Sequence, residues 1–122
     1  MRGIAAYQSV SLESSDQRKL VVMCFEALIR RQKAAIEAYD EKKYLDGTEH
    51  LRISREIYCE LLVGLDHEAA PEMTSNLAGL YHFCIRELAM AGHEASGERV
   101  VETLRVTEEL YKGFKAAFAS EG

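Results

Sequence analysis

The sequence predicts an all-α protein, an antiparallel up-down-up-down four-helix bundle with a short N-terminal extended segment. Apolar side chains recur with helical spacing over four long stretches, and no stretch shows the strict alternation of a strand. The single proline, Pro71, and the glycine-rich turns fall between those stretches. With 122 residues, 48% of them hydrophobic, the chain can form one core, so residues 1–122 are expected to be a single domain.

The first two helices are expected at about residues 15–40 and 43–64. Ser14 or Ser15 can cap the first helix, with Asp16 in its first turn and Gln17 placed for a capping box. The second helix carries its inward stripe at Leu51, Ser54, Tyr58, Leu61 and Leu65.

The last two helices are expected at about residues 72–91 and 97–119. Pro71 suits a first helical turn, where its missing N–H costs no hydrogen bond. Ser96 or Gly97 opens the last helix. The inward side chains of the third helix are predicted to be Met73, Leu77, Leu80, Cys84 and Leu88, with Tyr81 beside them. Those of the last helix are Val100, Leu104, Thr107, Tyr111, Phe114 and Phe118.

The stretch "LVVMCFEALI", Leu20 to Ile29, has more apolar surface than one core requires. Its apolar side chains cover nearly the whole circumference of a helix, whereas a helix facing one core needs a stripe a little over 100° wide. Three explanations remain open at this point. The helix is central in the fold, it forms a homodimer interface, or it lines a groove for a partner.

The stretch "GIAAYQSVSL", residues 3–12, has no charged side chain and no helical period. Residues 1–13 are therefore expected to form a lid that lies along the apolar groove, with Ile4 and Tyr7 burying their apolar parts. A frayed terminus is the alternative.

Composition excludes several classes of partner. The net charge of -5 argues against nucleic acid or an anionic membrane as the main partner, and the run "RRQK" at residues 30–33 is typical of a solvated helix face. No stretch is long and apolar enough for membrane insertion, and no signal peptide opens the chain. Three separated cysteines indicate reduced thiols, so a soluble, cytoplasmic protein is expected.

No catalytic or metal-binding motif stands out. The residue three positions before each histidine is never glutamate, which excludes the Glu-x-x-His motif of di-iron bundles. Phosphate-binding loops and the common hydrolase motifs are missing as well. The sequence therefore predicts no enzyme activity, no cofactor and no metal.

Four segments, in order, resemble the FliS family of flagellin-specific export chaperones. They are "AYQ" with the "LVVMCFEAL" helix, "ISREIYCELLVGLD", "NLAGLYHFCIRELAMA" and "LYKGFKAAF", and the resemblance extends over residues 4–118. The chain departs from the family pattern at four places: Asp16, Phe25 and Ala27 replace a proline, a tyrosine and a glycine, and the "AAPEM" stretch replaces a loop glycine before the third helix.

The resemblance implies a bundle without catalytic activity that binds the disordered C-terminal segment of flagellin. Such a chaperone prevents polymerisation in the cytoplasm and passes its client to the flagellar export apparatus. The residues expected to bind the partner, or to gate its site, are Ile4, Tyr7, Gln8, Leu20, Val21, Cys24, Phe25 and Leu28. The alternative is a homodimeric structural or adaptor bundle without a flagellin client.

Overall fold

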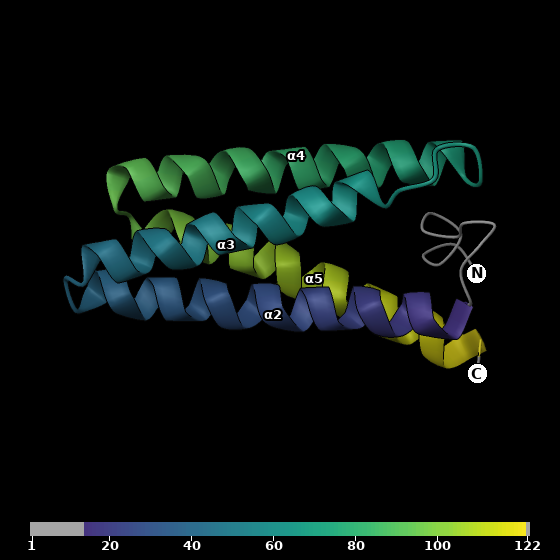
Figure 1. Ribbon diagram of the computed structural model, residues 1–122, viewed down its shortest axis with the longest axis horizontal. Helices are drawn as coiled ribbons and strands as arrows, with labels where there is room; N and C mark the ends of the chain where they lie inside the picture. Colours follow the sequence, from purple (N-terminus) through teal and green to yellow (C-terminus); the bar gives the residue numbers. More distant parts are fainter. Residues whose placement is uncertain (1–13, 122) are drawn as a thin grey trace.

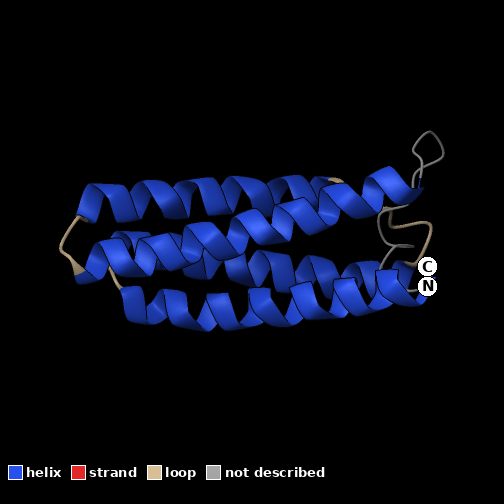
Figure 2. Ribbon diagram, turned by 90° about the horizontal axis from the view of Figure 1, so that it is seen from below, coloured by secondary structure: helices blue, strands red, loops and turns tan. Residues whose placement is uncertain are grey.

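Residues 14–121, the part of the chain that the computed structural model describes, form four helices and no strand (Figures 1 and 2). They are α2 (Ser14–Asp40), α3 (Tyr44–Val63), α4 (Pro71–Glu94) and α5 (Gly97–Glu121). The predicted four-helix fold is confirmed, and the helix ends lie within a few residues of the predicted ones. The predicted extended segment, residues 1–13, lies outside the described residues.

The helices form a bundle in which each one packs along two neighbours. Helix α2 contacts α3 and α5, and α4 contacts the same two helices from the opposite corner (Figure 1). Helix α2 is thus one of four corners, so the explanation that it is central in the fold is wrong. The α2–α3 and α4–α5 turns lie at one end of the bundle, here called the turn end. The opposite, terminal end holds the α3–α4 loop, the start of α2 and the end of α5.

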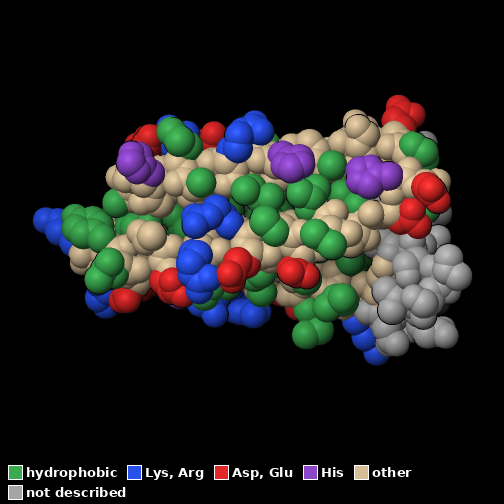
Figure 3. Space-filling view, turned by 45° about the horizontal axis from the view of Figure 1, so that its top comes forward, with side chains coloured by type: hydrophobic (Ala, Val, Ile, Leu, Met, Phe, Trp, Pro, Cys, Tyr) green, Lys and Arg blue, Asp and Glu red, His purple; other side chains and the backbone are tan. Residues whose placement is uncertain are grey.

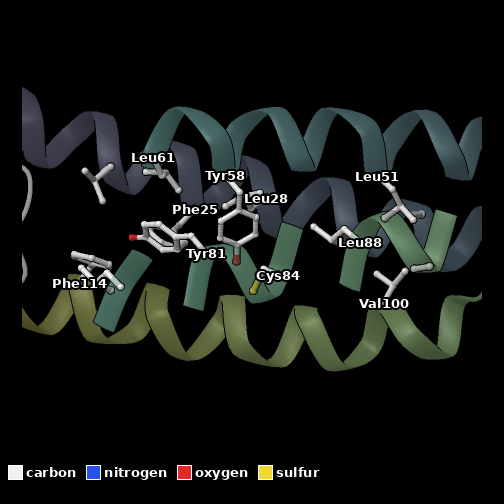
Figure 4. Close-up of a cluster of buried hydrophobic side chains, with 14 of the residues drawn as sticks. Phe25, Leu28, Leu51, Tyr58, Leu61, Tyr81, Cys84, Leu88, Val100 and Phe114 are labelled. Carbon is white, nitrogen blue, oxygen red and sulfur yellow. The ribbon is translucent and has the colours of Figure 1, made fainter. Parts of the chain in front are cut away.

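An aromatic cluster occupies the core toward the terminal end (Figure 4). The ring of Phe25 stacks on Phe114 at a centroid distance of 5.3 Å, and Tyr81 lies 5.6 Å from Tyr58. Tyr81 is fully buried, whereas Leu80 is 40% exposed, so the predicted inner face of α4 is corrected at these two positions. Tyr81 faces inward because its ring fits between those of Phe25 and Tyr58.

A polar cluster joins α2, α3 and α5 inside the bundle. The Thr107 hydroxyl donates to the carbonyl of Thr103 at 2.8 Å. It accepts hydrogen bonds from Gln32 Nε2 at 3.0 Å and from the Tyr58 hydroxyl at 2.5 Å. Thr107 is buried, and its hydroxyl uses its one proton and both lone pairs. This one oxygen atom therefore links side chains of α2, α3 and α5 by hydrogen bonds.

The turn end is closely fitted. The edge of the Tyr39 ring lies over Gly47, where an added Cβ would come within 2.5 Å of Cε1, and the Tyr39 hydroxyl bonds Thr48 Oγ1 at 2.9 Å. Gly47 is therefore needed for the close approach of α2 and α3. The two turns reverse the chain with Lys42 and Ala95 in the left-handed region, at φ of 63° and 52°.

The α4–α5 turn comes later than the sequence indicates. Gly92 continues α4, because it packs against Leu51 and Arg55 of α3, and Ala95 closes the helix with a hydrogen bond from Ser96 N to Ala91 O. Ser96 then caps α5 by accepting the Arg99 N–H at 3.2 Å. Pro71 occupies the first turn of α4 as predicted.

Candidate functional site

A groove of about 630 Å³ opens between α2 and α3 at the terminal end. It is called the α2–α3 groove below. Helix α2 provides one wall, and the end of α3 with the following loop provides the other. Its apolar lining consists of Leu20, Val21, Cys24, Leu61, Val63 and Leu65, and its polar lining includes Gln17, Glu60, Asp66 and His67.

Two large apolar side chains on the walls of the α2–α3 groove face solvent. Leu20 is 59% exposed and Val63 is 81% exposed, although both belong to helices that pack in the bundle. Val21 and Leu61 are buried and connect the groove to the core. An apolar groove with exposed walls and a few polar groups at its margin is typical of a surface that takes an apolar partner segment.

Gln17 places an unpaired polar atom in the α2–α3 groove. The residue is 7% exposed, and no atom of residues 14–121 donates a hydrogen bond to its Oε1. A buried acceptor without a donor costs about 1–3 kcal/mol. This cost falls on a residue that lines the α2–α3 groove.

Cys24 lies half-buried on the same wall. Burial raises the pKa of its thiol, and the nearby Glu60 carboxylate raises it further. The thiol therefore stays protonated at neutral pH and acts as a small apolar contact surface, without the thiolate character of a nucleophile.

The structure separates the residues that the sequence predicted for this site. Leu20, Val21 and Cys24 line the α2–α3 groove. Phe25 and Leu28 are fully buried and belong to the core, so the expectation that they line a groove is corrected. Ile4, Tyr7 and Gln8 lie outside the described residues.

The sequence did not predict the second wall of the α2–α3 groove. Val63, Leu65, Asp66 and His67 come from the end of α3 and the loop after it. A signal was available, because "LLV" at residues 61–63 places three apolar residues in succession just before Gly64. A single helical face cannot bury three consecutive residues, so one of them had to remain outside the core.

The described residues hold no candidate metal site and no candidate membrane span. Within residues 14–121, no group of three His, Cys, Asp or Glu side chains could hold a metal ion, and the histidines visible in Figure 3 stand apart from one another. No helix in this part of the chain combines the length and the apolar character needed to cross a membrane.

Comparison with known proteins gives a consistent result. The family model for flagellar protein FliS matches residues 1–121. The flagellar secretion chaperone FliS of Campylobacter jejuni subsp. jejuni serotype O:6 (strain 81116 / NCTC 11828) is 28% identical over 121 residues, which cover 95% of this chain and 91% of that protein. The flagellar secretion chaperone FliS of Escherichia coli (strain K12) is 29% identical over 110 residues, or 84% of this chain and 81% of that protein.

Proposed function

This chain belongs to the FliS family, and on that premise we propose that it is a cytoplasmic chaperone that binds the C-terminal segment of flagellin. It prevents premature polymerisation of its client and assists delivery to the flagellar type III export apparatus. The observation that carries the proposal is the α2–α3 groove with its exposed apolar walls. The family is not a class of enzymes, and its characterised relatives are named as secretion chaperones.

The chemistry of the groove suits a disordered client that folds as it binds. An amphipathic helix can lay its apolar side chains against Leu20 and Val63, which is helix-in-groove recognition. Burial of each such side chain contributes roughly 1.5–3 kcal/mol, and ordering the client offsets part of this gain. A backbone N–H or a hydroxyl of the client would satisfy Gln17 Oε1.

The segment before α2 is the proposed lid. Residues 1–13 directly precede Ser14, and Gln17, three residues later, already lines the α2–α3 groove. In this proposal Ile4 and Tyr7, with Gln8 beside them, cover the groove when no client is bound and are displaced by flagellin. The lid is weakly held, because the entropy of ordering thirteen residues opposes the burial of a few apolar side chains.

The first test places a charge in the groove. Leu20→Asp is expected to weaken binding of a synthetic flagellin C-terminal peptide at least 30-fold by titration calorimetry, since a buried carboxylate would face an apolar segment. Leu45→Asp is the matched control, because Leu45 is 87% exposed near the start of α3, at the turn end, and does not line the α2–α3 groove. Equal affinities for the two variants would contradict the assignment of the groove.

The second test concerns the lid. Tyr7→Ala is expected to weaken the binding of the flagellin peptide or the docking of residues 1–13, while the melting temperature stays nearly unchanged, because a lid contributes little to the core. A large fall in melting temperature would show that Tyr7 belongs to the core, and the lid would have to be abandoned.

A homodimeric adaptor without a flagellin client is the remaining alternative. Leu20 and Val63 could equally be covered by a second copy of the chain. Sedimentation velocity with and without the flagellin peptide separates the two functions. A monomer that binds the peptide is expected, whereas a tight dimer that ignores the peptide would refute the chaperone proposal.

A further inference from the structure

A second groove lies on the other flank of α2, between α2 and α5 at the terminal end. This α2–α5 groove measures about 340 Å³ and has an apolar floor of Val22, Met23 and Phe118. Met23 is 63% exposed, slightly more than Leu20 in the α2–α3 groove. The two grooves share helix α2 but have no lining residue in common.

The margin of the α2–α5 groove is basic. Arg18 and Lys19 line it from α2. Helix α5 adds Lys115, which lies three residues before Phe118 in the chain. The Nζ atom of Lys115 lies 5.1 Å from the centre of the Tyr111 ring. Lys19 and Lys115 are both exposed, and neither forms an ion pair with any residue between 14 and 121.

The basic character continues along the seam between the two helices. Positions 19, 23, 26, 30 and 33 are spaced by three or four residues, so they form one stripe of α2. Two contacts place this stripe beside α5. The Tyr111 hydroxyl donates to Glu26 Oε2 at 2.8 Å, and Lys33 lies 4.0 Å from Glu108. Glu26, the one acid of the stripe, is therefore already engaged, while Arg30 adds a further exposed cation.

This stripe contrasts with the rest of the chain. The stripe holds the cations Lys19, Arg30 and Lys33 and the single acid Glu26, whereas the whole chain has a net charge of -5. A basic surface of an acidic protein thus borders an apolar groove. A surface of this kind attracts acidic partners through its potential and holds them through apolar contact.

We propose that the α2–α5 groove is a second docking surface, separate from the proposed flagellin site, and that it binds an acidic amphipathic segment of a protein partner. Apolar side chains of that segment cover Val22, Met23 and Phe118. Its carboxylates face Lys19, which lines the groove, and Arg30 and Lys115 along the seam between the two helices.

The charge of the α2–α5 groove disfavours a second copy of the chain, residues 1–13, nucleic acid and an anionic membrane as its occupant. A second copy related by two-fold symmetry would place the basic stripe against itself, so like charges would meet. The chain's own residues 1–13 contain a single acid, Glu13, and one cation, Arg2, so they offer little complementarity. A nucleic acid or an anionic membrane extends beyond the groove and would meet the acidic remainder of the molecule, whereas a short peptide segment lies on the basic stripe alone.

The test uses methionine as a reporter. The full chain is labelled with 13C at its methionine methyl groups and titrated with a synthetic 14-residue peptide of Leu and Glu, with Leu at helical spacing. Met23 lies in the groove, whereas Met73 and Met90 belong to α4. We expect a saturable shift of the Met23 methyl resonance that weakens as salt is added, with Met90 unchanged. A peptide with Lys in place of Glu is expected not to bind.

Two charge-matched variants identify the surface. Lys19→Glu/Lys115→Glu is expected to weaken peptide binding about tenfold, because two exposed ion pairs are replaced by repulsions. Arg86→Glu/Lys42→Glu changes the net charge equally at exposed positions away from the groove and is expected to bind like the unmodified protein. Both variants are expected to keep the original melting temperature. Equal weakening in both, or an equal shift of Met90, would overturn the proposal.

Two competition experiments separate the second surface from other functions. The flagellin C-terminal peptide is expected to leave the Met23 shift in place. If it displaces the acidic peptide, the α2–α5 groove belongs to the client site and the second surface is refuted, whatever the outcome for Leu20→Asp. An oligouridine RNA that binds more tightly than the acidic peptide, with the same dependence on Lys19 and Lys115, would assign the groove to nucleic acid.

Discussion

The two ends of the bundle are built from the same four helices but treat their side chains differently. At the turn end Tyr39 fills the space over Gly47, and Arg99 bonds both Glu87 at 2.8 Å and Glu94 at 3.1 Å. At the terminal end two grooves remain open, and Gln17 Oε1 is buried without a donor from residues 14–121.

This difference indicates that the turn end contributes mainly to stability, whereas the terminal end provides surface for binding partners. Helix α2 contacts both α3 and α5, but α3 lies close to α2 at the turn end and diverges from it toward the terminal end (Figure 1). Side chains therefore find partners inside the chain more completely at the turn end. The apolar side chains exposed at the turn end, among them Tyr44, Leu45 and Val101, do not alter this contrast, because none of them lines either groove.

The largest effect is expected from the polar cluster. Thr107→Val preserves the shape of the side chain but removes the acceptor of Gln32 Nε2 and of the Tyr58 hydroxyl. Two buried donors without partners are expected to lower the free energy of unfolding by about 2–4 kcal/mol in urea denaturation.

The control for that variant is Thr103→Val, one turn away. The Thr103 hydroxyl is also buried, but it donates only to the Val100 carbonyl of its own helix. We expect a loss of about 1 kcal/mol or less, which is the net contribution of one ordinary hydrogen bond. Similar losses for both variants would mean that the cluster does not link the helices.

Alanine at two glycines should give effects of opposite sign at the two ends. Gly47→Ala pushes a methyl group into the Tyr39 ring and is expected to cost about 1–3 kcal/mol. Gly79→Ala, in the half of α4 toward the terminal end, meets no atom within 4 Å and is expected to add about 0.5–1 kcal/mol. Thermal unfolding of both variants checks this, and a stabilised Gly47→Ala would remove the contrast between the ends.

The smallest effect concerns thiol chemistry. Burial raises the pKa of the Cys24 thiol, so less of it is thiolate at pH 8 and its alkylation by iodoacetamide should be slower than that of the exposed Cys59. Cys84 is buried and its pKa is also raised by burial, so it should react last. Peptide mass mapping over time gives the three rates.

The same reaction tests the α2–α3 groove. Saturating flagellin peptide is expected to slow the alkylation of Cys24 several-fold while Cys59 is unaffected. Protection of Cys59 in place of Cys24 would move the client to the surface between α3 and α4 that Cys59 and Ile85 line, away from the α2–α3 groove.

Periodicity and turn chemistry predicted the helices, because their signals are local. Which of two neighbouring apolar residues on a helix points into the core was harder to predict. Leu80 and Tyr81 are adjacent, so both lie near the inner face of α4, and the rings of Phe25 and Tyr58 on two other helices decide that Tyr81 is buried. The extension of α4 past Gly92 likewise depends on contacts with α3 that no local pattern contains.

The candidate site was predicted from one side only. The excess of apolar residues at 20–29 indicated a surface beyond the core, and Leu20, Val21 and Cys24 do line a groove. Phe25 and Leu28 could not be separated from them, because which part of a wide apolar face points inward depends on where α3 and α5 pack. Val63 comes from a different helix, and its proximity to Leu20 is a property of the fold.

The position of residues 17–24 beside both grooves limits where the protein can be engineered for solubility. Every side chain in this stretch either lines one of the two grooves or is packed against the core. A substitution made there to improve solubility would therefore alter a contact surface, even where the fold tolerates it. Exposed apolar positions away from both grooves, such as Leu45 and Val101, are the places where polar residues can be introduced to keep the protein in solution at high concentration.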